Sequence, residues 1–411
     1  MLQRCLHKKL RLLALIFLLF TSWCAHAQLN PAVGASPWKW TNPAPVGFSF
    51  TDMSFIDDNT GLAVGQNGAI ARTTDGGQTW AYIPFKFVNA ANTISLPIIN
   101  DVQFVTPTIA YAVGASGMMI KSIDGGFNWA PVSTPLTPGN KNINALHFLN
   151  KDTGYIGGQS ITSGNTVSIE DAPKIYFTRN GGSTWDSLTT PFVPNQTNTT
   201  LNWNNQKEIQ RIHFANDSVG YAVGSAGAGQ SALLWKIEKH VVTDYSIHRT
   251  KFGMTTGTHT PSSQTFKGVV AVNDSLVLMS SLNNNVTIRV RTGKNDSTAN
   301  AVPAIYGNYV KGKYEIVIWL ASTATPFPAS LNGSVAGQMH HLKKMPGGKI
   351  ALSVGNSIAF TPDNGDNWTF TKPIPTTINY SHWGFSALDV TPGGRIITGS
   401  FNGLVYDSLP G

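Results

Sequence analysis

The octet TTDGGQTW at residues 73–80 recurs three more times, and this recurrence decides the fold. The other copies are SIDGGFNW at 122–129, TRNGGSTW at 178–185 and TPDNGDNW at 361–368. Each copy follows short segments rich in β-branched and aromatic residues, which is typical of strands. One octet with a carboxylate could be a chemical site, whereas four copies spread along the chain indicate a structural repeat.

The segments ahead of each tryptophan return in the same order. In the first unit, MSF ends at Phe55, GLAVG covers 61–65 and AIART covers 69–73. In the second unit, VQF ends at Phe104 and AYAVG covers 110–114. The third unit has the same order with an insertion. A fourth unit contains the GYAVG strand but lacks the octet. Four short strands per unit of roughly 40–50 residues are typical of a propeller blade.

Three later and more degenerate units occupy 265–325, 338–374 and 384–409. The last unit has only three strands, and SPWKWTNPAP at 36–45 resembles the tryptophan-bearing fourth strands. Pairing the two ends of the chain would remove open sheet edges. We therefore expect an all-β fold: a seven-bladed β-propeller of four-stranded antiparallel blades, closed by the N-terminal strand completing the last blade. Eight blades are the alternative, if 265–325 contains two units.

Residues 1–27 have the pattern of a secretory signal: early basic residues, the apolar run Leu12–Phe20 and the small-x-small sequence Ala25-His26-Ala27. We expect cleavage near Ala27, a single β-propeller domain at 28–411, and a secreted, periplasmic or cell-surface location. No second apolar stretch approaches the ~18 residues of a membrane span.

Composition excludes several classes of function. The cysteines, Cys5 and Cys24, both lie in the predicted signal, so the mature chain would have no disulfide, thiolate metal site or cysteine nucleophile. Without the signal the chain has 25 basic and 21 acidic residues, a net charge of +4 with no basic run. This pattern does not predict nucleic-acid binding. We expect no cofactor and no metal, and a monomer.

The octets favour a structural role over a chemical one. Asn180 replaces the aspartate in the third copy, and an amide can hold a turn but cannot serve as a general base. The octets also connect third to fourth strands, on the face opposite the usual propeller site. The residues to which we assign this role are Thr73, Asp75, Gly77, Trp80, Asp124, Gly126, Trp129, Asn180, Gly182, Trp185, Asp363, Gly365 and Trp368.

The octet matches the Asp-box consensus, Ser/Thr-x-Asp-x-Gly-x-Thr-Trp, of BNR-like repeats. With Gly-Tyr-Ala-Val-Gly strands ahead of Asp-Gly-Gly-x-Thr-Trp, the chain resembles the photosystem II assembly and stability factor family (Ycf48/HCF136-like) over about 48–240, and more loosely over 338–409. The resemblance implies a propeller that assists assembly of a membrane complex by protein contact. It names no partner for this chain.

Aromatic and basic residues on the face opposite the octets suggest a binding surface for a protein or a glycan. The candidates are Trp203, Arg211, His340, His341, His382 and Trp383, with Trp203 and Arg211 placed on one inter-blade loop. Ordinary packing between blades is the alternative for these residues. The sequence favours a non-catalytic, protein-binding or assembly scaffold of the cell envelope.

The competing hypothesis is a glycan-binding propeller or a glycoside hydrolase. It depends on Asp52 and Asp101, which stand at matching places in the first strands of two units. Strand-end solvation is the alternative for this pair. A polar column of first-strand positions could also line the channel: Ser54, Gln103, His147, His213, Val270, Lys343 and Asp389. A metal held by His147 and His213 would lack a third ligand at useful spacing.

Overall fold

The computed structural model describes residues 38–41, 49–85, 87–88, 94–137, 141–159, 173–188, 207–226, 231–245, 247–248, 265–281, 286–296, 308–320, 339–355, 357–371, 385–400 and 405–408. Residues 37–411 form one compact unit. The predicted signal at 1–27 and residues 160–172 of the insertion predicted at 159–173 lie outside the described residues. No helix among the described residues is long and apolar enough to cross a bilayer.

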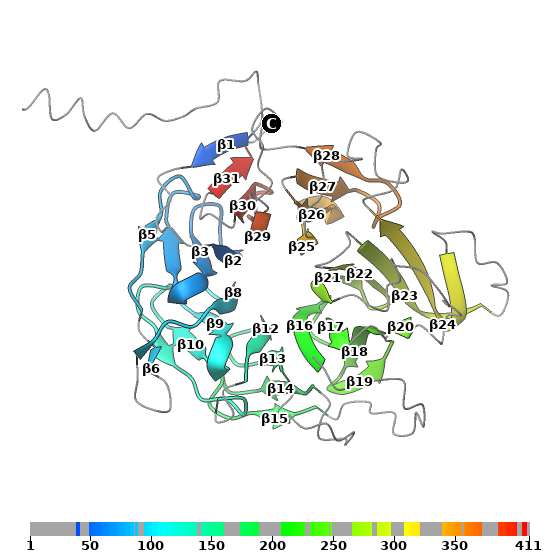
Figure 1. The fold of residues 1–411 in the computed structure, drawn as a ribbon, viewed down its shortest axis with the longest axis horizontal. Helices are drawn as coiled ribbons and strands as arrows, with labels where there is room; N and C mark the ends of the chain where they lie inside the picture. The colour runs from blue at the N-terminus through cyan, green and yellow to red at the C-terminus, as the bar shows by residue number, and fades with distance from the viewer. Residues whose placement is uncertain are drawn as a thin grey trace, which may run out of the picture. The chain divides into compact units, whose positions relative to one another are not determined.

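Antiparallel sheets surround a common axis, and the strands of a sheet follow one another outward in chain order, apart from β1 (Trp38–Thr41), which is the outermost strand of the last sheet (Figure 1). The first three have strands β2 (Phe50–Phe55), β3 (Gly61–Gly65), β4 (Ile70–Thr73), β5 (Ala81–Tyr82); β8 (Ile99–Phe104), β9 (Ala110–Gly114), β10 (Met119–Ser122), β11 (Ala130–Pro131); and β12 (Ile143–Phe148), β13 (Gly154–Gly158), β14 (Ile175–Thr178), β15 (Asp186–Ser187). A two-stranded ribbon, β6 (Phe87–Val88) with β7 (Ile94–Ser95), follows β5.

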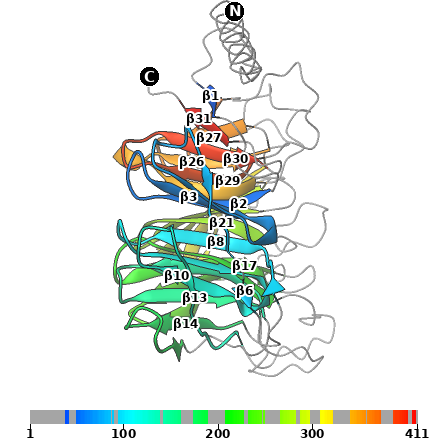
Figure 2. The same ribbon diagram turned by 90° about the vertical axis from the view of Figure 1, so that its left-hand side faces the viewer.

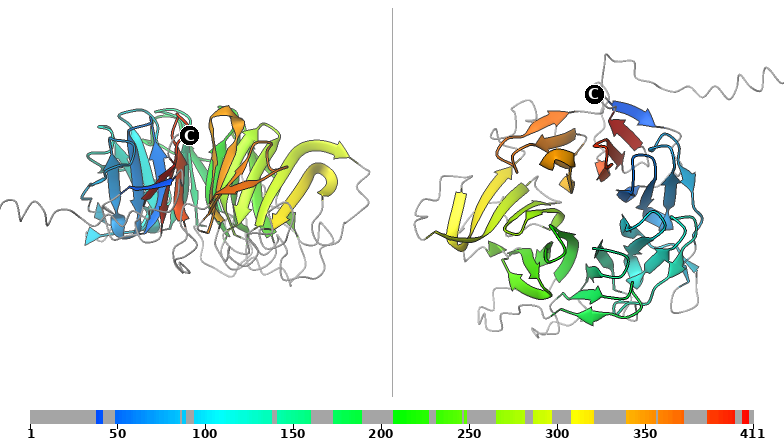
Figure 3. Two further views of the ribbon diagram at one scale, coloured as in Figure 1. Left: turned by 90° about the horizontal axis from the view of Figure 1, so that it is seen from above. Right: turned by 180° about the vertical axis from the view of Figure 1, so that it is seen from behind.

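The later sheets keep this order around the axis, as the views from above and behind show (Figure 3). They comprise β16 (Lys207–Phe214), β17 (Val219–Ala226), β18 (Ser231–Glu238), β19 (Val241–Asp244), β20 (Ile247–His248); β21 (Phe266–Asn273), β22 (Leu276–Ser281), β23 (Val286–Asp296), β24 (Asn308–Leu320); β25 (Met339–Lys344), β26 (Ile350–Val354), β27 (Ser357–Thr361), β28 (Thr369–Thr371); and β29 (Phe385–Val390), β30 (Ile396–Ser400), β31 (Val405–Ser408) with β1 (Trp38–Thr41).

The all-β propeller class agrees with the sequence prediction, but the predicted number of four-stranded blades is wrong. Six four-stranded blades are present among the described residues, rather than seven or eight; the sheet that begins with β16 has five strands. Its third strand, β18, is eight residues long, and β19 pairs only with Trp235–Glu238. The other half of β18 would be an open edge, and β20 pairs there with Ser231 and Ala232.

The two ends of the chain meet in one sheet. β1 pairs antiparallel with β31, with Trp38 opposite Ser408 and Thr41 opposite Val405. The first strand in sequence is thus the outermost strand of the sheet that contains the last, and this pairing holds the ring closed.

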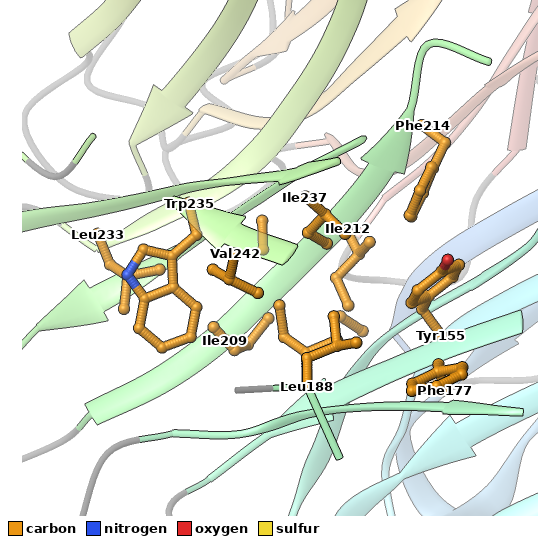
Figure 4. Packing of buried hydrophobic residues seen from close by; sticks show 13 residues of the cluster. Tyr155, Phe177, Leu188, Ile209, Ile212, Phe214, Leu233, Trp235, Ile237 and Val242 are labelled. Carbon is orange, nitrogen blue, oxygen red and sulfur yellow. The ribbon is translucent and has the colours of Figure 1, made fainter. Parts of the chain in front are cut away.

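Cores lie between neighbouring sheets, where the apolar faces of both contribute. Figure 4 shows one such core, to which Tyr155 and Phe177 of one sheet and Phe214 and Trp235 of the next contribute. The Tyr155 and Phe214 rings stack with centroids 4.5 Å apart. Burying each large side chain stabilises the fold by roughly 1.5–3 kcal/mol. The strands of successive sheets lie side by side when viewed edge-on (Figure 2).

The phenylalanine that ends a first strand explains the glycine that starts the second. A Cβ atom at Gly61 would lie 2.5 Å from the ring of Phe55, and one at Gly154 would lie 2.4 Å from Phe148. The ring therefore occupies the space of a side chain, and only glycine fits beside it.

Candidate functional site

The innermost strands of the sheets surround a channel along the common axis. The same irregularity, a β-bulge, recurs in each of these first strands. The pairing of first with second strand shifts register at the same place, for example between Phe50 and Asp52 and between Ile99 and Asp101. Such a bulge inserts one extra residue. Simple alternation is therefore interrupted at neighbouring polar residues such as Thr51 and Asp52.

The bulge residues link neighbouring first strands. Asn100 Nδ2 donates to the Ile143 carbonyl at 3.0 Å, and Asn144 Nδ2 donates to the Ile209 carbonyl at 3.2 Å. Thr51 and Ser386 make the equivalent bonds, to the carbonyls of Ile99 and Phe50. Neighbouring blades do not pair their backbones as strands of one sheet do. These side-chain hydrogen bonds join them instead.

The predicted polar column makes a second set of links. Ser54 Oγ accepts from the Phe104 N–H at 2.9 Å, Gln103 Oε1 from the Phe148 N–H at 2.7 Å, His213 Nδ1 from the Ala271 N–H at 3.2 Å and Asp389 Oδ2 from the Phe55 N–H at 2.7 Å. Val270 of this column lies instead in the core between β21 and β25. Much of the column therefore holds the blades together.

Between these two sets lies a charge cluster that joins three sheets. Arg211 Nη1 is 3.2 Å from Asp52 Oδ2 and 2.7 Å from Asp101 Oδ1. The carboxylates are 1% and 5% exposed. Asp52 also accepts from the Val102 N–H at 3.4 Å, and Asp101 accepts from the Leu146 N–H at 3.0 Å. Both aspartates lie inside strands β2 and β8 rather than at solvated strand ends.

His341 and Lys343 of β25 extend the cluster. His341 Nε2 is 3.0 Å from the Thr51 carbonyl and 2.9 Å from the Ser386 carbonyl, so this nitrogen carries a proton. His341 Nδ1 is 3.5 Å from Asp52 Oδ1. Lys343 Nζ is 3.2 Å from Asp389 and 3.9 Å from Asp52.

The two aspartates have opposite protonation preferences. Burial would raise the pKa of Asp52, but Arg211, Lys343 and His341 outweigh burial and hold it well below its usual range. Burial raises the pKa of Asp101 to about 8, because Arg211 offsets it only in part and the charge of Asp52 adds to it. These opposite shifts favour the ionised form of Asp52 and the protonated form of Asp101.

Two cavities adjoin the cluster. The larger, about 200 Å³, lies toward the octet end of the channel and includes Ser54, Gln103, His147 and His213 in its lining. The smaller, about 140 Å³, lies toward the start of the first strands and includes Thr51, Asn100, Asn144 and Gln210. Arg211, Lys267 and His341 line both cavities.

The histidine pair is neutral. Burial, together with the charge of Lys343, lowers the pKa of His147 to about 4. Burial also lowers the pKa of His213, and His147 and Lys343 add to this. The ring centroids are 5.4 Å apart. Among the described residues no three potential metal ligands gather.

The predicted binding residues do not form one surface in the described part of the chain. Arg211 belongs to β16, and its predicted place on an inter-blade loop is wrong: its guanidinium points into the channel. His341 also lines the channel, and His340 precedes it in β25. Trp203, His382 and Trp383 lie outside the described residues.

The four octets form one kind of turn. In the first, Thr73 donates to Asp75 Oδ1 at 2.8 Å, and the same carboxylate oxygen accepts from the Thr79 N–H at 2.8 Å. Trp80 Nε1 donates to the Gly77 carbonyl at 3.0 Å. The oxygens at Asp124, Asn180 and Asp363 make corresponding bonds in the other copies, between Ser122 and Asn128, Thr178 and Thr184, and Thr361 and Asn367.

Sequence reasoning missed Lys267 and the bulge residues Thr51, Asn100, Asn144, Gln210 and Ser386, although it included His340 and His341 at the bulge of β25. The signal was present, because a polar residue stands two places before the apolar column in each first strand, as in Asn144 before Leu146 and Gln210 before Ile212. Strict alternation would place these residues away from the axis. Only the register shift turns these bulge residues toward the channel axis.

These features define a β-propeller with a charged, buried axial cluster. No family model matches the chain. The chain is similar to Ycf48 proteins over part of its length. It is 41% identical over 63 residues to the photosystem II assembly protein Ycf48 of Thermosynechococcus vestitus, covering 15% of this chain and 18% of that protein. It is 41% identical over 70 residues to the photosystem II assembly lipoprotein Ycf48 of Prochlorococcus marinus, covering 16% and 20%. The chain thus matches about a fifth of the length of these relatives.

Solved structures agree on the fold over nearly the whole chain. Ycf48 bound to a D1 peptide superposes with a TM-score of 0.59 at 17% identity, over 92% of this chain and 97% of that one. Ycf48 from Cyanidioschyzon merolae gives 0.54 at 17% identity, over 91% and 98%. The WD40 propeller domain of Doa1 gives 0.54 at 12% identity, over 90% and 94%.

Proposed function

We propose that this chain is a protein-binding propeller that assists the assembly of a protein complex in the cell envelope. The observation that carries the proposal is the 41% identity to photosystem II assembly proteins within a fold that superposes on Ycf48 bound to a peptide. The envelope location rests on the signal pattern at 1–27. The partner of this chain would be a polypeptide of its own envelope.

The geometry of the two channel carboxylates does not suit glycoside hydrolysis. Such enzymes place an acid and a base or nucleophile about 5–9.5 Å apart, on either side of the bond they cleave. Asp52 and Asp101 are instead joined by one nitrogen of Arg211, at 3.2 and 2.7 Å, and each also holds a backbone N–H of the next blade. A structural role for the pair fits these contacts.

We place the docking surface on the face opposite the octets. There the segment before β8 exposes Leu96 and Ile98, with side chains 51% and 43% exposed, around Pro97. Pro97 accepts from the Gly68 N–H at 2.9 Å, in the connection between β3 and β4. On the octet face the exposed Phe127 is already stacked by Arg72 at 4.0 Å. Exposed apolar side chains on a connection held by a backbone hydrogen bond suit a protein partner.

Site-specific photo-crosslinking tests this proposal in cells of the producing organism. A photoreactive phenylalanine analogue is placed at Leu96 or, as the matched control, at Phe127, whose exposure is 54%. We expect discrete protein adducts from position 96 and none from position 127. Adducts from position 127 alone, or from neither position, would contradict the proposal.

A further inference from the structure

Several donors that line the larger channel cavity have no acceptor among the described residues. Arg211 contacts Asp52 and Asp101 through Nη1 alone. Its Nε and Nη2 bond to no described residue. The outer edge of the guanidinium, formed by Nε and Nη2, is therefore available to a ligand. Such an edge can bind a carboxylate through two parallel hydrogen bonds.

Lys267 forms no ion pair within 4.0 Å with a carboxylate of the described residues, although the charge of Glu208 acts on it. It occupies the bulge position of β21, where Asn100, Asn144 and Ser386 make inter-blade bonds in other sheets. Lys267 forms no such bond in the described part of the chain, and it lines both cavities. Burial lowers its pKa, and the charge of Arg211 adds to this.

His213 contributes a third donor. Its Nδ1 accepts from the Ala271 N–H at 3.2 Å, so in the neutral ring the proton is on Nε2. A protonated Nε2 cannot bind a metal but can donate to an oxygen. His213 lines the larger cavity only, which distinguishes this cavity from the smaller one.

Most of the lining's acceptors already have partners. Asp52 Oδ1 has no hydrogen bond, but it lies 3.5 Å from His341 Nδ1 and 3.9 Å from Lys343 Nζ. Ser54 and Gln103 accept hydrogen bonds from backbone N–H groups of the next blade. Asp52 and Asp101 form ion pairs with Arg211. Asp389 pairs with Lys343 at 3.2 Å. Arg211, Lys267 and Lys343 bring three cationic groups to the lining, where Asp52 and Asp101 share Arg211 and Asp389 pairs with Lys343.

We propose that the cavity of about 200 Å³ at the octet end of the channel binds a small monoanionic carboxylate, held by Arg211, Lys267 and His213. Its volume suits a compact acid, since an engineered protein cavity of about 150 Å³ holds benzene. The carboxylate belongs to a free acid or to an acidic side chain of a bound protein. The site is independent of the docking surface at Leu96 and of the partner proposed above.

Isothermal titration calorimetry of the full mature chain at pH 6.5 tests the site, with propionate as the probe and propionamide as its uncharged counterpart. We expect saturable heat from propionate and none from propionamide. The Lys267→Gln variant, which keeps a polar side chain and loses the charge, should bind propionate at least tenfold more weakly. The control Lys151→Gln, on an exposed turn, should change affinity by less than twofold.

The wild-type comparison does not depend on the folding of any variant, and melting temperatures show whether Lys267→Gln is folded. A third probe, acetyl-Gly-Glu-Gly-amide, separates the sources: tighter binding than propionate indicates a protein-borne carboxylate, and weaker binding a free acid, both within the proposed site. Absence of saturable propionate binding, equal binding of propionamide, or unchanged affinity in folded Lys267→Gln would overturn the proposal.

Discussion

Replacing Arg211 by Met should destabilise this protein more than any surface substitution. The change removes the cation that lies 3.2 Å from Asp52 and 2.7 Å from Asp101, both nearly inaccessible to solvent. Breaking a buried ion pair by removing one partner costs about 3–5 kcal/mol. At about 2 °C per kcal/mol for a large domain, the melting temperature should fall by about 6–10 °C at pH 7.

The loss should depend on pH with a defined sign. In the wild type the pKa of Asp52 is lowered, so its contribution to stability is present above the unfolded pKa and is lost only as the pH falls through the folded pKa in strong acid. Without Arg211, only Lys343 and His341 oppose the effect of burial, so the pKa of this carboxyl should rise. The deficit of the variant should therefore be small near pH 4 and grow as the pH rises toward 7.

Differential scanning fluorimetry from pH 4 to 8 measures this, with urea unfolding to convert shifts into free energies. Lys151→Met is the control, because Lys151 and Asp152 are 63% and 52% exposed and such pairs contribute about 0–1 kcal/mol. A second substitution, Asp52→Asn, should restore part of the loss at pH 7 by removing the unpaired charge. A loss below about 1 kcal/mol, or one that does not change with pH, would refute the charge cluster as a source of stability.

Three further substitutions test other parts of the structure. Asp101→Asn should cost little at pH 7 and flatten the stability profile between pH 5 and 8, because a carboxyl with pKa raised to about 8 stabilises at low pH and loses that contribution as the pH rises through 8; a steep loss at pH 7 in urea unfolding would show that Asp101 is ionised there. Asp124→Asn should be nearly neutral and Asp124→Ala should cost about 1–2 kcal/mol, because both N–H bonds to its oxygen are lost; equal melting temperatures would contradict the turn role. Gly126→Ala should cost about 1–3 kcal/mol more than Gly347→Ala. Both glycines have positive φ, but only a Cβ at 126 would meet Leu62, at 2.8 Å. Equal losses on thermal unfolding would show that the Leu62 side chain moves aside without strain.

The sequence predicted the repeating parts of the fold because repetition averages out local ambiguity. The strands that end at Phe55 and Phe104 and the turns that follow Thr73 and Ser122 lie where the spacing placed them. The chain-end pairing of Trp38–Thr41 with β31 was also foreseen, from a tryptophan-bearing segment without a sheet of its own.

The sequence did not predict the site because its geometry depends on bulges and on contacts across the ring. Period-two alternation cannot place both Thr51 and Asp52 toward the axis, and only the register shift allows this. Arg211 was assigned to an inter-blade loop beside Trp203, although it lies in β16 and its guanidinium contacts Asp52 and Asp101 of two other sheets. The five-stranded sheet arose from the length of β18, which no turn signal marks.

The affinity of the purified chain for the partner identified by crosslinking tests the central claim most directly. The claim predicts that Leu96→Glu/Ile98→Glu raises the Kd at least tenfold, since both exposed apolar side chains would face the partner. The control Ile123→Glu/Phe127→Glu, on the octet face, should leave the Kd within twofold at an unchanged melting temperature. An unchanged Kd in the first variant, or a loss confined to the second, would contradict the account of this chain as a propeller that binds its partner opposite the octets.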